Sequence, residues 1–393
     1  MKDINNDQAK FRIGSKSLLS AVNMARKVIV SKPVIPALEN LHISVKDNRL
    51  TVTASDTETT ISVGRDIVAG GYSGEFMVMP DFLTVALKGL VFPPLDFTVA
   101  GGRVDVSWDG GMLSGPSIDI ADWPATEGLN GEIETATFDS AELLHCLSLV
   151  EYAVSTEEIR PVLCGVRFEL DGASGLTLIG SDAHRLACSR VKGSSSFRAF
   201  GFTLPRRCVG FLKSVLSTPG VVSLTCDGQY AIFEHEEALT TVRCRLIEGK
   251  FPNWRQLIPG SFSVAADISK EPLLQSLVRL TVASGVSRAV VLSFVQGASE
   301  VFSRDLGLSI EASEKLDCEL VKGQGVDICF RLEYLRSVIE KMPGSRLRLL
   351  FNEPTKAVFV IEAEETKKGE GVPMGVQDVP VFALVMPIID PFA

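Results

Sequence analysis

The stretch from residue 178 to 189 reads L-I-G-S-D-A-H-R-L-A-C-S and places four polar residues within five positions: Ser181, Asp182, His184 and Arg185. The chain has only four histidines. Serine, histidine and aspartate together are the residue types of a hydrolase site, in which Ser181 would be the nucleophile and His184 the base. The alternative is that these side chains line the rim of a binding site.

The spacing of these residues argues against hydrolysis. A catalytic triad usually draws its members from distant parts of the chain, because serine must lie beside histidine and histidine beside the carboxylate. On a strand, Asp182 and His184 would share a face while Ser181 points away. No G-x-S-x-G motif is present either. We therefore expect a protein that is not an enzyme, and a Ser/His hydrolase is only the remote alternative.

The composition indicates a folded chain with sizeable cores. It has 393 residues, 46% hydrophobic and 22% charged, and at roughly 100–200 residues per domain two to four domains are expected. No apolar run approaches the roughly 20 residues of a membrane span, and the polar N-terminus is unlike a signal peptide. The eight cysteines form no C-x-x-C pair and have no metal-type spacing. We expect a cytoplasmic protein with buried, reduced thiols, no metal, no cofactor and no membrane partner.

An internal repeat divides the chain into three parts. Six pairs of identical residues lie 125 positions apart: Leu18 and Leu143, Pro36 and Pro161, Leu38 and Leu163, Pro80 and Pro205, Leu87 and Leu212, and Lys88 and Lys213. One position further on, S-D-T-E (55–58) matches S-D-A-H (181–184), and residues 334–351 echo 211–226 more faintly. The repeat predicts three domains, over residues 1–126, 127–258 and 259–393.

Each part has the same order of elements. Apolar residues spaced three and four apart predict helices over about 14–30, 80–91, 139–155, 205–218, 269–285 and 331–342. Alternating segments predict strands, among them 41–45, 50–54, 166–170 and 176–180. The expected fold class is α+β, with three tandem copies of a domain made of two helices and antiparallel sheet.

Charge is distributed unevenly along the chain. The net charge is −9, yet the six helical segments carry twelve basic and seven acidic residues, a balance of +5 that leaves −14 elsewhere. One interpretation is a basic helical face that binds phosphates. The other is that surface helices carry lysines by chance.

Four stretches in order make the chain resemble the family of bacterial beta sliding clamps, the beta subunits of DNA polymerase III. They are K-P-V-I-P-A-L-E-N-L (32–41), S-D-A-H-R-L-A (181–187), E-G-K-F-P-N-W-R-Q-L-I-P (248–259) and L-V-M-P (384–387). The resemblance covers essentially the whole chain. It implies the DNA clamp fold and a head-to-tail homodimer ring that encircles double-stranded DNA without sequence specificity. It also implies a non-catalytic processivity factor whose partners are the DNA polymerase III alpha subunit, the clamp loader, repair polymerases and other clamp-motif proteins.

The resemblance implies three sets of site residues. A partner-peptide pocket between the second and third domains would use Leu163, Ser181, Ala183, His184, Arg185, Leu186, Pro252, Leu257, Leu384, Val385, Met386, Pro387 and Ile388. DNA would be contacted by Arg26, Lys27, Lys32, Arg160, Arg206, Arg207, Lys213, Arg279 and Arg336. The dimer interface would place Leu113 against Val282 and Ala283 of the other subunit.

The pocket residues and the basic residues also have a plain structural interpretation. Leu186, Leu384 and Val385 fit ordinary strand core, and any of the basic residues fits a solvated surface charge. His184 and Arg185 would offer hydrogen-bond donors at the rim of the pocket.

Two features depart from the family pattern. Gln256 stands where relatives carry an arginine, and the chain continues after Met386 and Pro387 with I-I-D-P-F-A (388–393). The unusual C-terminus leaves a specialised clamp, from a phage, a plasmid or a repair system, as the alternative function. A charged segment, 362–378, is expected to be a mobile loop.

Overall fold

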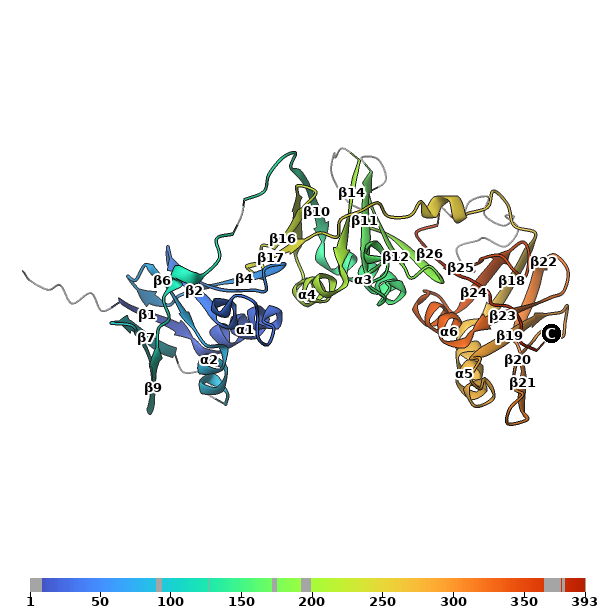
Figure 1. Cartoon of the computed structure of the whole chain (residues 1–393), viewed down its shortest axis with the longest axis horizontal. Helices are drawn as coiled ribbons and strands as arrows, with labels where there is room; N and C mark the ends of the chain where they lie inside the picture. The colour runs from blue at the N-terminus through green and yellow to red at the C-terminus, as the bar shows by residue number, and fades with distance from the viewer. Residues whose placement is uncertain are drawn as a thin grey trace, which may run out of the picture. The chain divides into compact units, whose positions relative to one another are not determined.

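The computed structural model describes residues 9–89, 94–126, 128–171, 175–191, 199–363, 376 and 379–392. The chain forms two compact units (Figure 1). Unit 1 contains Met1–Leu143 and Arg207–Leu246, and unit 2 contains Leu144–Arg206 and Ile247–Ala393. The middle of the chain therefore contributes to both units. Most of the charged segment 362–378 lies outside the described residues.

Unit 1 holds two antiparallel sheets. Their strand orders are β5-β1-β7-β8-β9 and β10-β15-β16-β17-β4-β3-β2-β6. The strands are β1 (Ala9–Gly14), β2 (Leu41–Lys46), β3 (Arg49–Ser55), β4 (Thr59–Asp66), β5 (Ala69–Gly70), β6 (Gly74–Val78), β7 (Pro94–Ala100), β8 (Arg103–Trp108), β9 (Gly111–Pro116), β10 (Glu134–Asp139), β15 (Val221–Cys226), β16 (Tyr230–His235) and β17 (Thr240–Arg245).

Unit 2 also holds two antiparallel sheets. Their orders are β14-β11-β12-β13-β26-β25-β24-β18-β22 and β21-β20-β19-β23. The strands are β11 (Gly165–Asp171), β12 (Gly175–Ser181), β13 (Arg185–Val191), β14 (Phe200–Pro205), β18 (Val264–Ser269), β19 (Ala289–Phe294), β20 (Glu300–Asp305), β21 (Ile310–Lys315), β22 (Cys318–Lys322), β23 (Val326–Arg331), β24 (Arg346–Phe351), β25 (Val358–Glu362) and β26 (Val381–Val385).

The six predicted helices are confirmed. They are α1 (Ser15–Ala25), α2 (Pro80–Leu87), α3 (Ser140–Val150), α4 (Arg206–Leu216), α5 (Lys270–Leu280) and α6 (Leu332–Lys341). A 3₁₀ turn follows α1, α3 and α5, namely η1 (Arg26–Val28), η4 (Glu151–Ala153) and η7 (Thr281–Ala283). The α-helices therefore end earlier than predicted. Pro80 begins α2, where its missing N–H costs little, whereas Pro205 is the last residue of β14.

Helix packing follows the predicted apolar faces. Helices α1 and α2 lie side by side in unit 1, and α5 and α6 do so in unit 2 (Figure 1). In unit 2, Leu277 of α5 and Leu335 of α6 are fully buried in one core with Leu349 and Val360 of the large sheet. Each such side chain contributes roughly 1.5–3 kcal/mol by leaving water. The predicted α+β class with antiparallel sheet is confirmed.

Two strand pairings join segments that are far apart in the sequence. In unit 1, β17 pairs with β4 and places Arg243 opposite Thr60. In unit 2, β13 pairs with β26 and places Leu186 opposite Leu384. Each large sheet thus combines strands from two repeats, and the pairing of β13 with β26 brings together Leu186 and Leu384 of the predicted peptide pocket.

Candidate functional site

The turn between β12 and β13 holds the polar cluster of Ser181, Asp182, His184 and Arg185. The Asp182 carboxylate accepts hydrogen bonds from the backbone N–H groups of His184 (2.9 Å) and Arg185 (2.7 Å). The Ser181 hydroxyl donates to the Arg185 carbonyl (2.9 Å) and accepts from the Ala183 N–H (3.2 Å). These bonds hold Ala183 in the left-handed region, at φ 71°.

The first repeat contains the same turn. Asp56 accepts from the N–H groups of Glu58 (3.1 Å) and Thr59 (2.7 Å), and the Ser55 hydroxyl donates to the Thr59 carbonyl (3.1 Å). Thr57 has a φ of 80°. The aspartate therefore stabilises the same turn in both copies.

Arg185, which was predicted to offer donors at the rim, also bonds to its own neighbours. Its Nε and Nη2 donate to Asp182 (2.9 and 2.7 Å), and its Nη1 donates to the Ser337 hydroxyl (2.5 Å). The guanidinium also lies over the rings of Tyr334 and Tyr152, 4.7 and 5.8 Å from their centroids. Arg185 thus ties β13 to α6.

His184 does not form a triad with its neighbours. Its ring is exposed and stacks on Tyr334 with a centroid distance of 5.3 Å. Ser181 bonds to the backbone of its own turn, and Asp182 bonds to Arg185. Within the described residues, Ser181, Asp182 and His184 therefore make no proton relay.

The predicted apolar pocket residues divide between the two faces of the sheet. Leu163, Leu186 and Leu384 are buried in one cluster, and Met386 is half-buried against it. The Met386 N–H also donates to the His184 carbonyl (2.8 Å). Val385 is fully buried in the other core, so its side chain does not reach this cluster.

The remaining pocket candidates lie at the border or elsewhere. Pro252 and Leu257 are exposed, and Pro387 is half-buried. Ile388 lies apart, because its N–H donates to the Cys329 carbonyl (2.9 Å) and its side chain packs against a small separate cluster with Phe392. The extension after Pro387 is thus anchored on the sheet of β19 and β23.

Sequence reasoning missed the aromatic residues of the cluster, among them Trp254 and Phe382. Trp254 is buried beside Phe382 at 5.9 Å between ring centroids, and its Nε1 donates to Glu169 (3.3 Å). Arg255 donates to the same carboxylate (2.7 Å) and lies over the Trp254 ring. The F-P-N-W run was the available signal, because a tryptophan in a polar connection has to find a partner surface.

The residues predicted to contact DNA differ in burial and in whether they form ion pairs within the chain. Arg26, Arg207 and Arg279 pair with Asp81 (3.6 Å), Asp56 (2.6 Å) and Glu314 (2.5 Å), respectively. Lys213 is half-buried. The exposed candidates with no ion pair to any described residue are Lys27, Lys32, Arg160, Arg206 and Arg336.

The predicted dimer residues have different exposures. Leu113 is half-buried on β9, the edge strand of its sheet. Val282 is 67% exposed, whereas Ala283 is fully buried and has no side-chain surface to offer.

Three further exposed apolar side chains lie in the same part of unit 2: Val286, Leu306 and Leu308. The Ser303 hydroxyl donates to the Ala283 carbonyl (3.2 Å), which holds η7 against the β20–β21 hairpin. The signal for Leu306 and Leu308 was the run D-L-G-L-S, which places two leucines in a hairpin turn where polar residues are usual.

Thiols, metals and membrane spans were assessed over the same residues. None of the eight cysteines, all of which are described, forms a disulfide, and six are buried, while Cys164 and Cys318 are only half-buried. Burial raises the pKa of Cys188 and of Cys329 to about 12. In the described ranges no three His, Cys, Asp or Glu side chains gather in a metal-type cluster. None of the helices there is long and apolar enough to span a membrane.

Three sequence models of one family match the chain in order. The DNA polymerase III beta subunit N-terminal, central and C-terminal domains match residues 9–127, 137–253 and 255–374. The beta sliding clamp of Vibrio cholerae is 22% identical over 368 residues, 91% of this chain and 96% of the relative. That of Synechocystis sp. is 27% identical over 376 residues, 87% and 93% of the two chains.

Solved structures of low sequence identity share the fold. The sliding clamp of Pseudomonas aeruginosa bound to griselimycin has a TM-score of 0.87 at 19% identity, covering 98% of this chain and 100% of the other. The DNA polymerase sliding clamp of Bacillus subtilis has a TM-score of 0.86 at 20% identity, with coverages of 98% and 100%. The three-domain arrangement of the fold is therefore common to these proteins.

Proposed function

Because the chain belongs to the DNA polymerase III beta subunit family, the beta sliding clamps, we propose that two copies form a ring that encircles double-stranded DNA and tethers polymerases. The protein is a DNA polymerase processivity factor. A ring needs to hold DNA without gripping bases, and topology provides the retention while phosphate contacts exchange quickly.

The observation that carries this proposal is the repetition of one strand pairing along the chain. β17 pairs with β4, and β26 pairs with β13. A third pairing of this kind would join β9 to β21. In the order of elements, β9 is the strand equivalent to β17 and β26, and β21 is the strand equivalent to β4 and β13. Both are edge strands within one chain, so pairing β9 of one copy with β21 of another completes the series. Ring closure would also remove two exposed sheet edges.

We assign the dimer contact to this pairing. Leu113 lies on β9, and Val282 is joined by the exposed Val286, Leu306 and Leu308 near the β20–β21 turn. Ala283 would act through the backbone of η7, since its side chain is buried. The domain boundaries that we propose are 1–126, 127–258 and 259–393.

The five exposed basic residues without an ion pair to any described residue are our preferred DNA contacts. Lys27, Lys32, Arg160, Arg206 and Arg336 can bind phosphate without first losing a carboxylate partner. Arg26, Arg207 and Arg279 would have to exchange one, and Lys213 is half-buried.

Partner peptides would bind at the border of the apolar cluster in unit 2. Leu163, Leu186 and Leu384 form its floor, Met386 offers an adaptable contact at the border, and His184 presents an exposed ring. Pro252 and Leu257 are exposed beside it, while Ser181, Ala183 and Arg185 shape the turn. An apolar cleft with few polar groups suits short linear motifs.

We further propose that the protein is not an enzyme and that it acts in the cytoplasm. The engaged Ser181 hydroxyl supports the first statement, and a serine-directed fluorophosphonate that labels Ser181 would contradict it. The anchored C-terminus gives residues 388–392 a structural role. The extension therefore does not by itself favour a specialised clamp.

The decisive experiment loads the protein onto nicked circular DNA with a clamp loader and then linearises the DNA. A topological ring slides off the free ends, and the DNA-bound fraction falls to background. Retention on linear DNA with free ends would overturn the proposal, and so would equal retention on linear DNA with free ends and with both ends blocked beforehand.

A further inference from the structure

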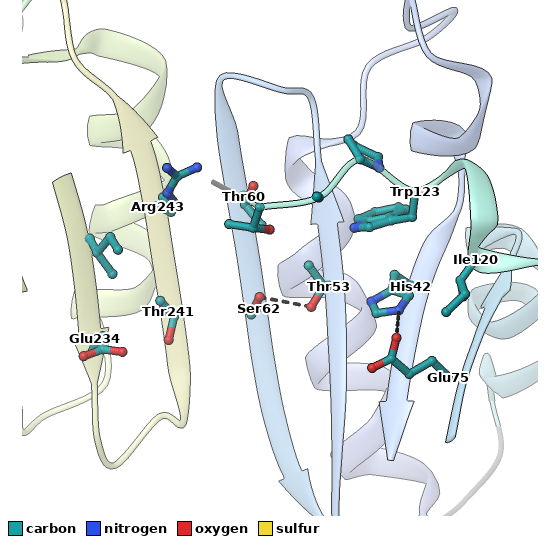
Figure 2. Close-up of a pocket in the computed structure, with 14 residues that line it drawn as sticks. His42, Thr53, Thr60, Ser62, Glu75, Ile120, Trp123, Glu234, Thr241 and Arg243 are labelled. Atoms are coloured by element: carbon teal, nitrogen blue, oxygen red, sulfur yellow. Dashed lines mark hydrogen bonds and ion pairs between the residues drawn. The ribbon is translucent and has the colours of Figure 1, made fainter. Parts of the chain in front are cut away.

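A cavity of about 480 Å³ lies in unit 1, on the face of the large sheet that the segment 120–126 crosses (Figure 2). One row of cross-strand neighbours spans its floor, in the order Glu234, Thr241, Ser62, Thr53 and His42. The hydroxyls of Thr53 and Ser62 are 3.0 Å apart. Trp123 stacks over His42, with ring centroids 5.2 Å apart. The cavity thus straddles the pairing of β17 with β4.

This floor is equivalent, residue for residue, to the apolar cluster in unit 2. The shared turn aligns Ser55 with Ser181, and the registers of the two pairings then fix the other positions. The equivalent pairs are Thr53 and Ile179, Thr60 and Leu186, Ser62 and Cys188, Ile232 and Phe359, Thr241 and Phe382, and Arg243 and Leu384. A tryptophan of the crossing segment packs there in each case, Trp123 in one and Trp254 in the other. The same architectural position is therefore apolar in one junction and polar in the other.

Arg243 is the unusual residue of the polar copy. Its Nε and Nη2 are buried and have no hydrogen-bond acceptor in the described part of the chain. The guanidinium lies over the Tyr230 ring, 3.7 Å from its centroid. A buried N–H without an acceptor destabilises the protein, so a ligand that brings an acceptor to this guanidinium is favoured.

The surrounding charges select the kind of acceptor. Glu75, which binds His42 (3.2 Å), and Glu234 also line the cavity. The two glutamates oppose a doubly charged phosphate more strongly than a singly charged carboxylate, and a carboxylate can pair with the planar guanidinium of Arg243 through two parallel hydrogen bonds. The Trp123 and His42 rings and the Ile120 and Ile232 side chains add an apolar surface beside it.

We propose that this cavity is a second peptide site, in which Arg243 binds the carboxylate of an acidic residue while the Trp123–His42 stack holds a neighbouring apolar side chain. The site is separate from the cluster around Leu186 and does not depend on ring formation. It gives one subunit two peptide sites of opposite character, one apolar and one that reads a negative charge.

The histidines allow a test in the full-length protein, because the chain has only four of them. His42 reports on the new site, and His184 reports on the apolar one. The probes are two capped peptides, acetyl-Gly-Asp-Leu-Phe-Gly-amide and the same peptide with asparagine for aspartate, together with inorganic phosphate. Binding is followed by ¹H–¹³C spectra of the histidine Cε1 positions. We expect the aspartate peptide to shift the His42 signal saturably and about tenfold more tightly than the asparagine peptide.

Substitutions identify the residue responsible. Arg243→Gln should weaken binding of the aspartate peptide about tenfold or more, and Arg243→Lys, which keeps the charge, should weaken it less. Arg304→Gln is the matched control, since Arg304 also lies over an aromatic ring, that of Phe302, and it should change nothing. An unchanged His235 signal in the Arg243 variants verifies that unit 1 is folded.

Three results would overturn the inference. They are an unmoved His42 signal at about 10 mM aspartate peptide, equal binding of the two peptides, and phosphate binding as tight as that of the aspartate peptide. A failure here is distinct from a failure of the clamp function, which is measured by DNA loading and by the response of His184 to clamp-motif peptides.

Discussion

Arg185 and Asp182 form a two-pronged ion pair at the end of a turn, with Nε and Nη2 of the arginine 2.9 and 2.7 Å from one carboxylate oxygen. Both side chains are largely buried, at 14% and 12% exposure. The other carboxylate oxygen accepts the two N–H groups of the turn, and the arginine continues to Ser337 and Tyr334 on α6. This polar cluster has the residue types of a catalytic site, but its bonds connect the β12–β13 hairpin to α6.

Replacing Arg185 with alanine should destabilise unit 2. The change removes two charge-assisted bonds and leaves one Asp182 oxygen without its partner, so we expect a loss of about 2–3 kcal/mol in the free energy of unfolding. His184→Ala is the control, because His184 is exposed and loses only a ring stack, at about 1 kcal/mol or less. Urea denaturation followed by circular dichroism measures both variants. Equal losses in the free energy of unfolding would show that the bonds of Arg185 stabilise unit 2 no more than the ring stack of His184 does.

The sequence predicted the local features of this region and not their long-range partners. Helical periodicity identified all six helices, and the match of residues 55–58 with 181–184 identified two equivalent segments, because both depend on neighbouring residues. The partners of Arg185 could not be found this way, since Ser337 lies 152 positions away. Only the pairing of β13 with β26 and the packing of α6 bring them together.

The sequence also did not predict which apolar side chains are buried within the chain. Ala283 and Val385 have the apolar character of contact residues, yet both are fully buried. Alternation along a strand indicates two faces but does not say which one another sheet or helix covers. The cavity beside Arg243 was hidden for the same reason, because Arg243 and Thr53 come from different repeats and meet only through the register of β17, β4 and β3.

Val282→Asp should convert the dimer to a monomer. Val282 is 67% exposed beside Val286 and the leucines of the β20–β21 turn, and a charge there would be buried against an apolar partner surface. Analytical ultracentrifugation measures the outcome, with Val295→Asp as the control because Val295 is an exposed valine in another turn of the same sheet. A dimer that survives Val282→Asp would remove this surface from the interface.

Thiol labelling should follow burial. Cys164 is half-buried, whereas Cys188 and Cys329 are buried and their pKa is raised to about 12. Because the thiolate is the reactive form, iodoacetamide at neutral pH should modify Cys164 long before the other two. Peptide mass spectrometry over time measures the order. Early modification of Cys188 would mean that the apolar cluster opens readily.

Glu314→Gln should strengthen DNA binding by releasing Arg279. Glu314 accepts hydrogen bonds from Arg279 at 2.5 Å and from the Ser276 hydroxyl at 2.6 Å, so Arg279 is occupied. Once released, Arg279 can contact a phosphate, and the slope of log affinity against log salt should steepen by up to about 0.9. Glu271→Gln also removes one negative charge, from α5, the helix that carries Arg279, and is the control. An equal gain in both variants would assign the effect to net charge alone.

The same pair predicts one component of acid sensitivity. The pKa of Glu314 is lowered to about 2, mainly by the hydrogen bonds from Arg279 and then by that from Ser276. A carboxylate with a depressed pKa stabilises the folded protein above its ordinary pKa of 4.5, and this contribution is lost as the pH falls toward about 2. In Glu314→Gln the melting temperature should therefore fall less steeply between pH 4.5 and pH 2 than in the unaltered protein. The pair is partly exposed, so the difference should shrink in high salt. Parallel slopes for both proteins at low salt would show that Arg279 does not hold this carboxylate in solution.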